Sequence, residues 1–184
     1  MLKKIITASM LTIVSSASFA NGFELNSPDL IKGKPIATTF VFNNFGCKGK
    51  NVSPALNWKN APHGTKSFAI TVHDPDAPTG VGGFRHWIVV DIPANATGIA
   101  QGAGKMGATM LADGGKQIVT DFGTTGWGGP CPPTGDAPHH YRFTVYALKV
   151  DKLDLPANAS AGLAGFMVNQ NAIGKVSVVS NYGR

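Results

Sequence analysis

Charged residues are scarce in this chain, and the few that are present do not cluster. Asp, Glu, Lys and Arg make up 14% of the 184 residues, and 16 basic against 10 acidic side chains give a formal net charge of +6. A nucleic-acid-binding domain needs a basic stripe or patch, and no run of Lys and Arg is present. The composition therefore argues against a nucleic-acid partner.

Long apolar segments are lacking after the first twenty residues, which argues against a transmembrane helix. The first twenty read MLKKIITASMLTIVSSASFA, with Lys3 and Lys4, an apolar stretch, and Ser18 and Ala20 as small residues at −3 and −1. This order is typical of a secretory signal peptide, and a short membrane anchor is the alternative. We expect cleavage after Ala20, a mature domain spanning 21–184, and a periplasmic or secreted location. Loss of the two lysines lowers the charge from +6 to +4.

Cysteine is equally scarce, since the chain has only Cys47 and Cys131. Two cysteines are too few for a closed zinc site, which takes four ligands. In an oxidising compartment an even number of cysteines favours a disulfide, and two buried free thiols are the alternative. We expect Cys47 and Cys131 to be joined.

Motifs of catalysis and of phosphate loops are also missing. There is no G-x-S-x-G sequence, and GAGK at 102–105 has the wrong glycine spacing, with Met106 where Ser or Thr should follow the lysine. Asp74, His86 and His139 are plausible metal-ligand types, but no H-x-x-x-H spacing supports a metal site. We therefore predict no catalytic residue, no metal and no cofactor. A secreted hydrolase or phosphatase that uses this Asp/His cluster is the alternative.

The residues that are abundant predict a β fold. Short runs of Val, Ile, Phe and Thr alternate with many of the 23 glycines and 12 prolines, which is typical of an antiparallel β-sandwich. A segment rich in Ala, Leu and Met predicts one late helix over 158–173, capped near Asn158 or Ser160. The Gly-rich stretch 98–115 is expected to be a loop. The expected strands are 36–42, 67–74, 85–92, 116–122, 140–148 and 175–181.

Three of these strands carry ionisable residues at one end of an apolar face. Side chains alternate between the two faces of a strand, so Asp74 ends one such face, while His86 and His139 each begin one. His140 falls on the outward face beside His139. The three faces are Phe68, Ile70, Val72 and Asp74; His86, Ile88, Val90 and Ile92; and His139, Tyr141, Phe143, Val145 and Ala147.

Strand pairing would gather these residues at one rim of the core. A hairpin through 75–84 brings Asp74 beside His86. If the strand that begins at His139 runs parallel to 85–92, His139 and Tyr141 join them. Each residue also has a purely structural interpretation, because an aspartate before a proline often only starts a turn, and a rim histidine often only makes structural hydrogen bonds.

The rim would suit a small anion. Two imidazolium groups, a tyrosine hydroxyl and backbone N–H groups donate hydrogen bonds, and a carboxylate accepts one from a protonated phosphate oxygen. The sequence HDPDAPTG at 73–80 predicts a rigid loop over this pocket, because proline fixes φ. GGPCPP at 128–133 could add N–H groups, with a plain stiff loop as the alternative.

Five motifs follow one another along the chain: FGCKGKNVSPALNW (45–58), DPDAP (74–78), RHWIVV (85–90), TDFGTTGWGGPCPP (120–133) and PHHYRFTVYAL (138–148). Together they resemble the phosphatidylethanolamine-binding protein family, also called Raf-kinase-inhibitor-like proteins, and in particular its bacterial YbhB/YbcL-type branch. The resemblance covers nearly all of the mature chain.

The resemblance implies a β-sandwich with a few peripheral helices and a pocket for phosphate, phosphoryl headgroups or acetate. Its pocket residues match Asp74, His86, His139 and Tyr141, with Gly129 and Pro130 in the lining loop and Asp76 and Pro78 bracing the other loop. The usual H-R-Y motif reads His139-His140-Tyr141 here, which leaves the arginine's ion pair in doubt. Arg85 replaces the usual second histidine and could recruit anions.

The resulting expectation is an exported, non-enzymatic binding protein whose partner is a small anion or a phosphorylated ligand. Family members bind lipids, inhibit kinases or proteases, or act as signalling scaffolds. A regulatory, inhibitor-like role through the protein surface and self-association into a homodimer therefore stay open.

Overall fold

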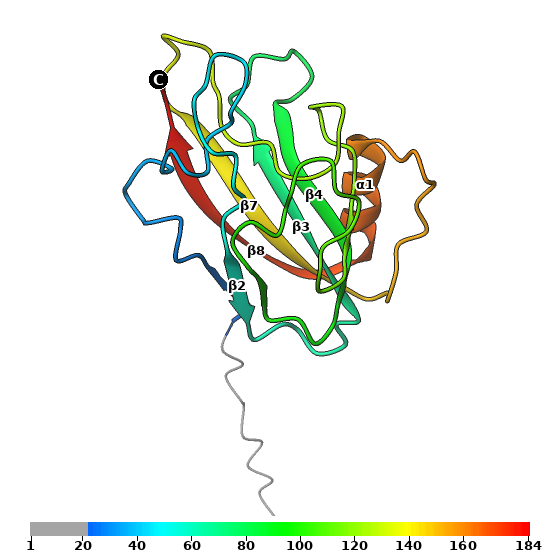
Figure 1. The fold of residues 1–184 in the computed structure, drawn as a ribbon. Helices are drawn as coiled ribbons and strands as arrows, with labels where there is room; N and C mark the ends of the chain where they lie inside the picture. The colour runs from blue at the N-terminus through cyan, green and yellow to red at the C-terminus, as the bar shows by residue number, and fades with distance from the viewer. Residues whose placement is uncertain (1–21) are drawn as a thin grey trace, which may run out of the picture.

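The computed structural model describes residues 22–184, so the expected signal peptide lies outside the described residues (Figure 1). The described chain is mostly β, with one helix. Its elements are β1 (Glu24–Asn26), β2 (Leu56–Lys59), β3 (Ser67–Asp74), β4 (Phe84–Pro93), β5 (Gly98–Ile99), β6 (Lys116–Gln117), β7 (His139–Leu148), α1 (Ala161–Asn171) and β8 (Ala172–Tyr182).

The strands form two antiparallel sheets. The larger sheet has the order β6-β4-β3-β7-β8, and the smaller has the order β1-β2-β5. Both β4 and β7 pair antiparallel with β3, so they run parallel to each other on either side of it. Figure 1 shows β2 on one face of the large sheet and α1 on the other. The predicted β-sandwich class is therefore confirmed, with a helix as a third layer.

The main core lies between the two sheets. Trp58 and Leu56 of the small sheet pack with every second residue of β3 and β7, because alternate side chains of a strand point to the same face. Tyr141 and Phe143 of β7 belong to this core and are fully buried. The face assignments for β3 and β7 are thus confirmed, and His140 is exposed on the outer side as predicted.

A second core lies between the large sheet and α1. Small residues of the helix, Ala161, Ala164 and Val168, pack against residues of β4 and β7 such as Val90 and Tyr146. Ser160 caps the helix, because its hydroxyl accepts a hydrogen bond from the Leu163 N–H at 3.2 Å. The predicted helix is confirmed, but it spans Ala161–Asn171 and is shorter than the expected 158–173.

A β-bulge in β4 gives His86 its position. The pairs Val72↔Trp87 and His73↔Arg85 leave His86 as an extra residue on β4, with no partner on β3. A bulge of this kind re-aims a side chain. His86 therefore lies on the main-core side, next to Trp87 in the sequence, whereas Ile88 and Val90 belong to the helix-side core. The prediction that His86 shares a face with Ile88 and Val90 is wrong.

One expected strand is absent, and another is much shorter than expected. Residues 36–42, of which Ile36, Phe40, Val41 and Phe42 are buried, form a turn. In this turn the Phe40 N–H donates to Ala37 O, and the Phe42 N–H donates to Pro130 O. Only Lys116–Gln117 of the expected 116–122 is extended in the sheet. The short strands β1, β2 and β5 were not predicted, because segments of two to four residues are too short to give a period-two signal.

Candidate functional site

The residues expected at one rim do meet, around a cavity of about 130 Å³. The cavity lies where β3 ends and where β4 and β7 begin, at the end of the large sheet that carries the C-terminus (Figure 1). Its wall is largely aromatic and prolyl, with four buried polar side chains. It is lined by Phe45, Asp74, Ala77, Phe84, His86, Phe122, Cys131, Pro132, Pro133, His139 and Tyr141.

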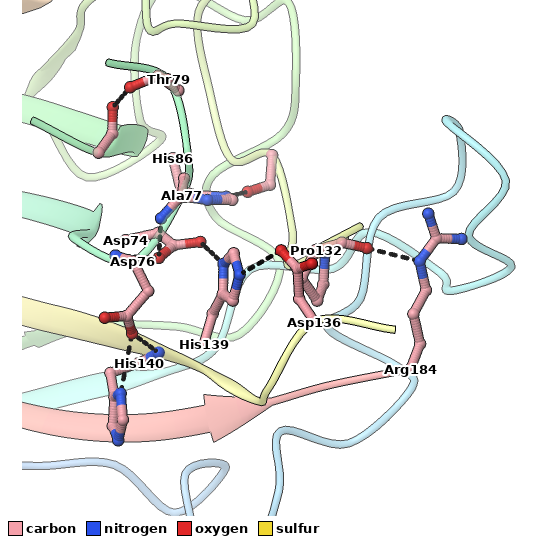
Figure 2. A network of polar contacts seen from close by, with 12 residues as sticks. Asp74, Asp76, Ala77, Thr79, His86, Pro132, Asp136, His139, His140 and Arg184 are labelled. Carbon is pink, nitrogen blue, oxygen red and sulfur yellow. Dashed lines mark hydrogen bonds and ion pairs between the residues drawn. The ribbon is translucent and has the colours of Figure 1, made fainter. Parts of the chain in front are cut away.

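Asp74 connects the rim loop to the pocket. Its Oδ1 accepts hydrogen bonds from the backbone N–H groups of Asp76 (2.9 Å) and Ala77 (3.1 Å), while its Oδ2 lies 2.7 Å from His139 Nδ1 (Figure 2). The first pair of bonds is the turn-starting arrangement typical of an aspartate before proline. Asp74 therefore starts the turn, as its structural interpretation predicts, and it also orients a pocket histidine, a role that the sequence did not indicate.

His139 is held between two carboxylates. Its Nε2 lies 3.3 Å from Asp136 Oδ2, on the side opposite Asp74 (Figure 2). Burial lowers the pKa of His139, but hydrogen bonds and charge from Asp74 and then Asp136 outweigh that effect, so the net pKa is raised. The raised pKa favours the imidazolium form of His139, which has a donor at each nitrogen facing the two carboxylates.

His86 lies in the opposite environment. Its Nδ1 is 2.7 Å from the Gly128 carbonyl oxygen, which can only accept, so Nδ1 carries the proton. The ring packs edge-on against Phe84, Phe122 and Tyr141, with ring centroids 5.1–5.4 Å apart. Burial lowers the pKa of His86 to about 4. The expectation that both histidines are imidazolium donors is therefore wrong for His86, whose Nε2 is a hydrogen-bond acceptor at neutral pH.

Tyr141 brings an unpaired hydroxyl to the pocket. The residue is fully buried, and its hydroxyl meets no acceptor in good hydrogen-bond geometry among residues 22–184, although the Asp74 carboxylate lies near it. Burial and then the negative charge of Asp74 raise the pKa of Tyr141, so the phenol keeps its proton. A buried donor without a partner costs free energy, and a ligand in this cavity can supply the missing acceptor.

A disulfide braces two of the loops that line the pocket. Cys47 and Cys131 are joined, as predicted, with their Cα atoms 6.0 Å apart. Arg184 adds two hydrogen bonds: its Nε donates to Pro132 O at 2.6 Å (Figure 2), and its Nη2 donates to Phe45 O at 3.4 Å. These contacts hold together the two loops that supply the aromatic and prolyl wall.

Gly129 and Pro130, expected to line the pocket, lie behind its wall instead. The Gly129 N–H donates to Asn51 Oδ1 at 2.8 Å, and a Cβ on Gly129 would meet Phe40 O at 2.2 Å. The Pro130 carbonyl accepts from the Phe42 N–H. Because these groups are used in packing the loop, they are not free for a ligand, and the next three residues, 131–133, form the wall.

The outer side of the rim loop is braced by a second pair. Asp76 Oδ2 accepts from the His140 N–H at 2.7 Å and lies 2.8 Å from His140 Nδ1. The backbone bond from His140 lowers the pKa of Asp76. Pro78 is the centre of a tight turn, in which the Thr79 N–H donates to Ala77 O. His140 stands where the family's H-R-Y motif has arginine, and its partner here is the Asp76 carboxylate.

Arg85 does not face the pocket. Its N–H donates to Asp121 Oδ2 at 2.7 Å, and its guanidinium lies 3.5 Å from the same oxygen. Its side chain lines a different hollow, between the large sheet and α1. The interpretation of Arg85 as an anion recruiter at the pocket mouth is therefore wrong.

Sequence reasoning missed Asp136 and the aromatic wall of Phe45, Phe84 and Phe122. Asp136 stands three residues before His139, a spacing without a helical or strand pattern here. Phe45 comes from a loop 29 residues before Asp74, and it has a positive φ of 53°. Loop residues carry no periodic signal, so only the motifs of the family could have indicated them.

The chemistry available is that of binding. The pocket offers an imidazolium, a phenol donor and an acceptor nitrogen inside an apolar wall, an arrangement typical of small-molecule sites. Among the lining residues there is no serine, threonine or free thiol, since Cys131 is in the disulfide. Within residues 22–184 no group of three or more His, Cys, Asp or Glu side chains has the arrangement of a metal site.

Comparison with known proteins agrees with the fold and the motifs. The model of the phosphatidylethanolamine-binding protein family matches residues 26–183. The chain is 44% identical to the UPF0098 protein YbcL of Escherichia coli K12 over 181 residues, covering 98% of each chain. It is 42% identical to the UPF0098 protein YbhB of the same strain over 159 residues, covering 86% of this chain and 99% of YbhB. The chain belongs to the phosphatidylethanolamine-binding protein family.

The structural match is also close. The crystal structure of E. coli YbcL, described as a new member of the mammalian PEBP family, superposes with a TM-score of 0.83 at 47% identity, covering 88% of this chain and 98% of that one. A further relative is the putative lipoprotein LppC of Mycobacterium tuberculosis H37Rv, 37% identical over 95% of this chain and 79% of LppC. Among the described residues, no helix has the length and apolarity needed to cross a membrane.

Proposed function

We propose that the protein is an exported, non-enzymatic binding protein whose pocket holds a small anion, either phosphate or the phosphoryl headgroup of a larger ligand. The observation that carries this proposal is the buried, unpaired Tyr141 hydroxyl in a cavity that also contains the His139 imidazolium. An anionic oxygen would accept from both groups. The name of the family supports a phospholipid headgroup as one source of that anion.

The neutral His86 suggests which form of the anion fits. Its Nε2 accepts a hydrogen bond while its Nδ1 donates to Gly128 O. A phosphate oxygen that keeps its proton can donate to this nitrogen, while unprotonated oxygens accept from Tyr141 and His139. Binding is expected to weaken as the pH rises through the pKa of His139, because the donor at His139 is lost; the raised pKa puts this above about pH 6.5.

A single hydroxyl deletion tests the proposal. Tyr141→Phe keeps the ring in the core and removes the donor, so phosphate or phosphorylethanolamine should bind more weakly by about 1.5–3 kcal/mol, the value of a hydrogen bond to a charged group. Tyr146→Phe is the matched control, because Tyr146 lies on the same strand but faces the helix-side core. Calorimetric titration measures both variants. Equal affinity of Tyr141→Phe and wild type would refute the role of the pocket.

The same variant separates pocket binding from a regulatory role at the surface. If the protein inhibits a kinase or protease through its surface alone, Tyr141→Phe keeps full inhibition, whereas a pocket-dependent inhibitor loses it. Native mass spectrometry of the exported protein would identify a retained ligand and count subunits in one measurement. A homodimer would appear there as twice the mass of the mature chain.

Export is part of the proposal and has its own support. The N-terminal twenty residues follow the order of a signal peptide, and one relative is named a putative lipoprotein. We expect the mature chain to begin at Asn21 and to be found in the periplasm or the medium. N-terminal sequencing of the fractionated protein checks this, and a chain that still begins at Met1 would contradict it.

A further inference from the structure

Asp136 holds the second ring nitrogen of His139 from outside the cavity: it lines a neighbouring hollow, and His139 lines both. Both nitrogens of the His139 ring are occupied: Asp74 takes Nδ1 and Asp136 takes Nε2 (Figure 2). Asp74 is buried and holds Nδ1 at 2.7 Å. Nε2 is therefore the ring nitrogen that can donate to a ligand. The chain's own carboxylate therefore occupies the donor nitrogen that the proposed function assigns to an external anion.

The two carboxylates are held very differently. The Asp74 contact is 2.7 Å long, and only 3% of that side chain is exposed; the Asp136 contact is 3.3 Å long, with 39% exposed. Charge-assisted N–H···O bonds are strongest at about 2.7–2.9 Å. Asp74 also holds two backbone N–H groups, whereas the Asp136 carboxylate makes no second hydrogen bond within residues 22–184. Asp74 is thus a fixed partner, and Asp136 is displaceable.

The loop that carries Asp136 is suited to such a displacement. Gly135 precedes it with a φ of 93°, in the region open to glycine. The backbone bonds that hold this turn are long, with Gly135 N–H to Arg184 O at 3.4 Å and Asp136 N–H to Pro133 O at 3.4 Å. A displaced carboxylate would remain at the surface, where water replaces its contact with His139.

We propose that Asp136 is a specificity-determining residue of the pocket, an internal carboxylate that a ligand must displace from His139 Nε2. This inference rests on the proposed function. Two anions cannot share one donor without repulsion, so binding is an exchange. A tethered carboxylate competes as if present at roughly millimolar concentration. Acetate, which is chemically equivalent to the Asp136 side chain, has no advantage over it, whereas a phosphoryl group with more charge and more oxygens does.

Variants of Asp136 test this exchange with two probes, inorganic phosphate and acetate, at constant ionic strength. Asp136→Asn removes the charge and keeps the shape, and Asp136→Ala removes the side chain. Both should bind phosphate about tenfold more tightly, the gain expected when a competing charge-assisted bond is removed, and acetate should gain at least as much. Asp154→Asn, an exposed aspartate before α1, changes the net charge equally and should leave both affinities within about twofold.

The outcomes separate this inference from the proposed function. If wild type binds phosphate and neither Asp136 variant binds it more tightly, the competitor role is wrong and the binding function stands. If no form binds phosphate, acetate or phosphorylethanolamine, both proposals fail. A ligand-free check uses NMR titration of the His139 ring. Asp136→Asn should lower the pKa of His139, and an unchanged value would show that the contact is absent in solution and would overturn the inference.

Discussion

The two histidines of the pocket have the same side chain and opposite chemistry. His86 enters through a bulge in β4, donates to a backbone carbonyl and is surrounded by aromatic rings, so burial lowers its pKa to about 4. His139 begins β7 between two carboxylates, and its pKa is raised. One wall of the pocket is therefore apolar and neutral, and the other is an ion-pair network.

The difference shows that a histidine in a pocket cannot be assigned a charge from its strand position alone. Both residues were expected as imidazolium donors because both begin a strand at the same rim. The partner of the second ring nitrogen decides the outcome: a carbonyl and apolar neighbours keep a ring neutral, whereas carboxylates keep it charged. The two walls should accordingly respond differently to mutation and to pH.

The largest effect is expected from removing the disulfide that braces the pocket loops. The Cys47–Cys131 disulfide closes a loop with a sequence separation of 84, which corresponds to about 4–5 kcal/mol on the chain-entropy model. A Cys47→Ser, Cys131→Ser double variant should lose about that much free energy of unfolding in urea titration. Its His139 wall should persist, with an unchanged His139 pKa by NMR. Wild-type stability in this variant would contradict the assigned role of the bond.

The next effect is a loss of stability at acid pH caused by His86. Its folded-state pKa of about 4 lies below its unfolded value near 6.5, so the unfolded chain binds more protons between these values. The neutral His86 therefore contributes fully to the free energy of unfolding above about pH 6.5. This contribution, about 3 kcal/mol in total, is lost as the pH falls toward 4. Urea unfolding across this range measures it.

A variant isolates this contribution from other acid effects. His86→Asn keeps a side-chain N–H that can reach Gly128 O but cannot gain a proton. The pH dependence of its stability between 6.5 and 4 should be flatter than that of wild type by most of that amount. Curves that stay parallel would show that His86 is not the group responsible.

The smallest effect concerns His140, which lies outside the pocket and pairs with Asp76. Both side chains are well exposed, so the pair should contribute only about 0.2–1 kcal/mol. Because the pKa of Asp76 is lowered, the contribution is present above about pH 4 and is lost as the pH falls below that. Asp76→Asn should cost this small amount in thermal unfolding and leave phosphate affinity unchanged. A large loss of affinity would place the outer pair inside the binding mechanism.

The sequence predicted the parts of the site that lie on long, alternating strands. Asp74, His139 and Tyr141 were placed correctly because burial alternates along the last four residues of β3 and the first four of β7, at the rim. His86 reached the correct pocket for the wrong reason, since a bulge, which alternation cannot reveal, reverses its facing.

The loop walls were harder to predict. Residues 36–42 are as apolar as a strand, but their backbone groups bond to nearby turns and to Pro130, which only the tertiary structure decides. Gly129 was displaced from the lining by the same packing. Asp136 was missed because nothing in a loop of Thr, Gly and Pro marks one aspartate as a partner of a buried histidine.

The most direct test is NMR observation of the two imidazole rings while inorganic phosphate is added at pH 7. The account predicts that, before phosphate is added, His86 is neutral with its proton on Nδ1 and His139 carries a proton on both nitrogens. Phosphate should then shift the His139 Nε2–H and Tyr141 signals saturably, and Tyr141→Phe should weaken the titration. A neutral His139, or saturating phosphate that leaves both signals unchanged, would contradict it.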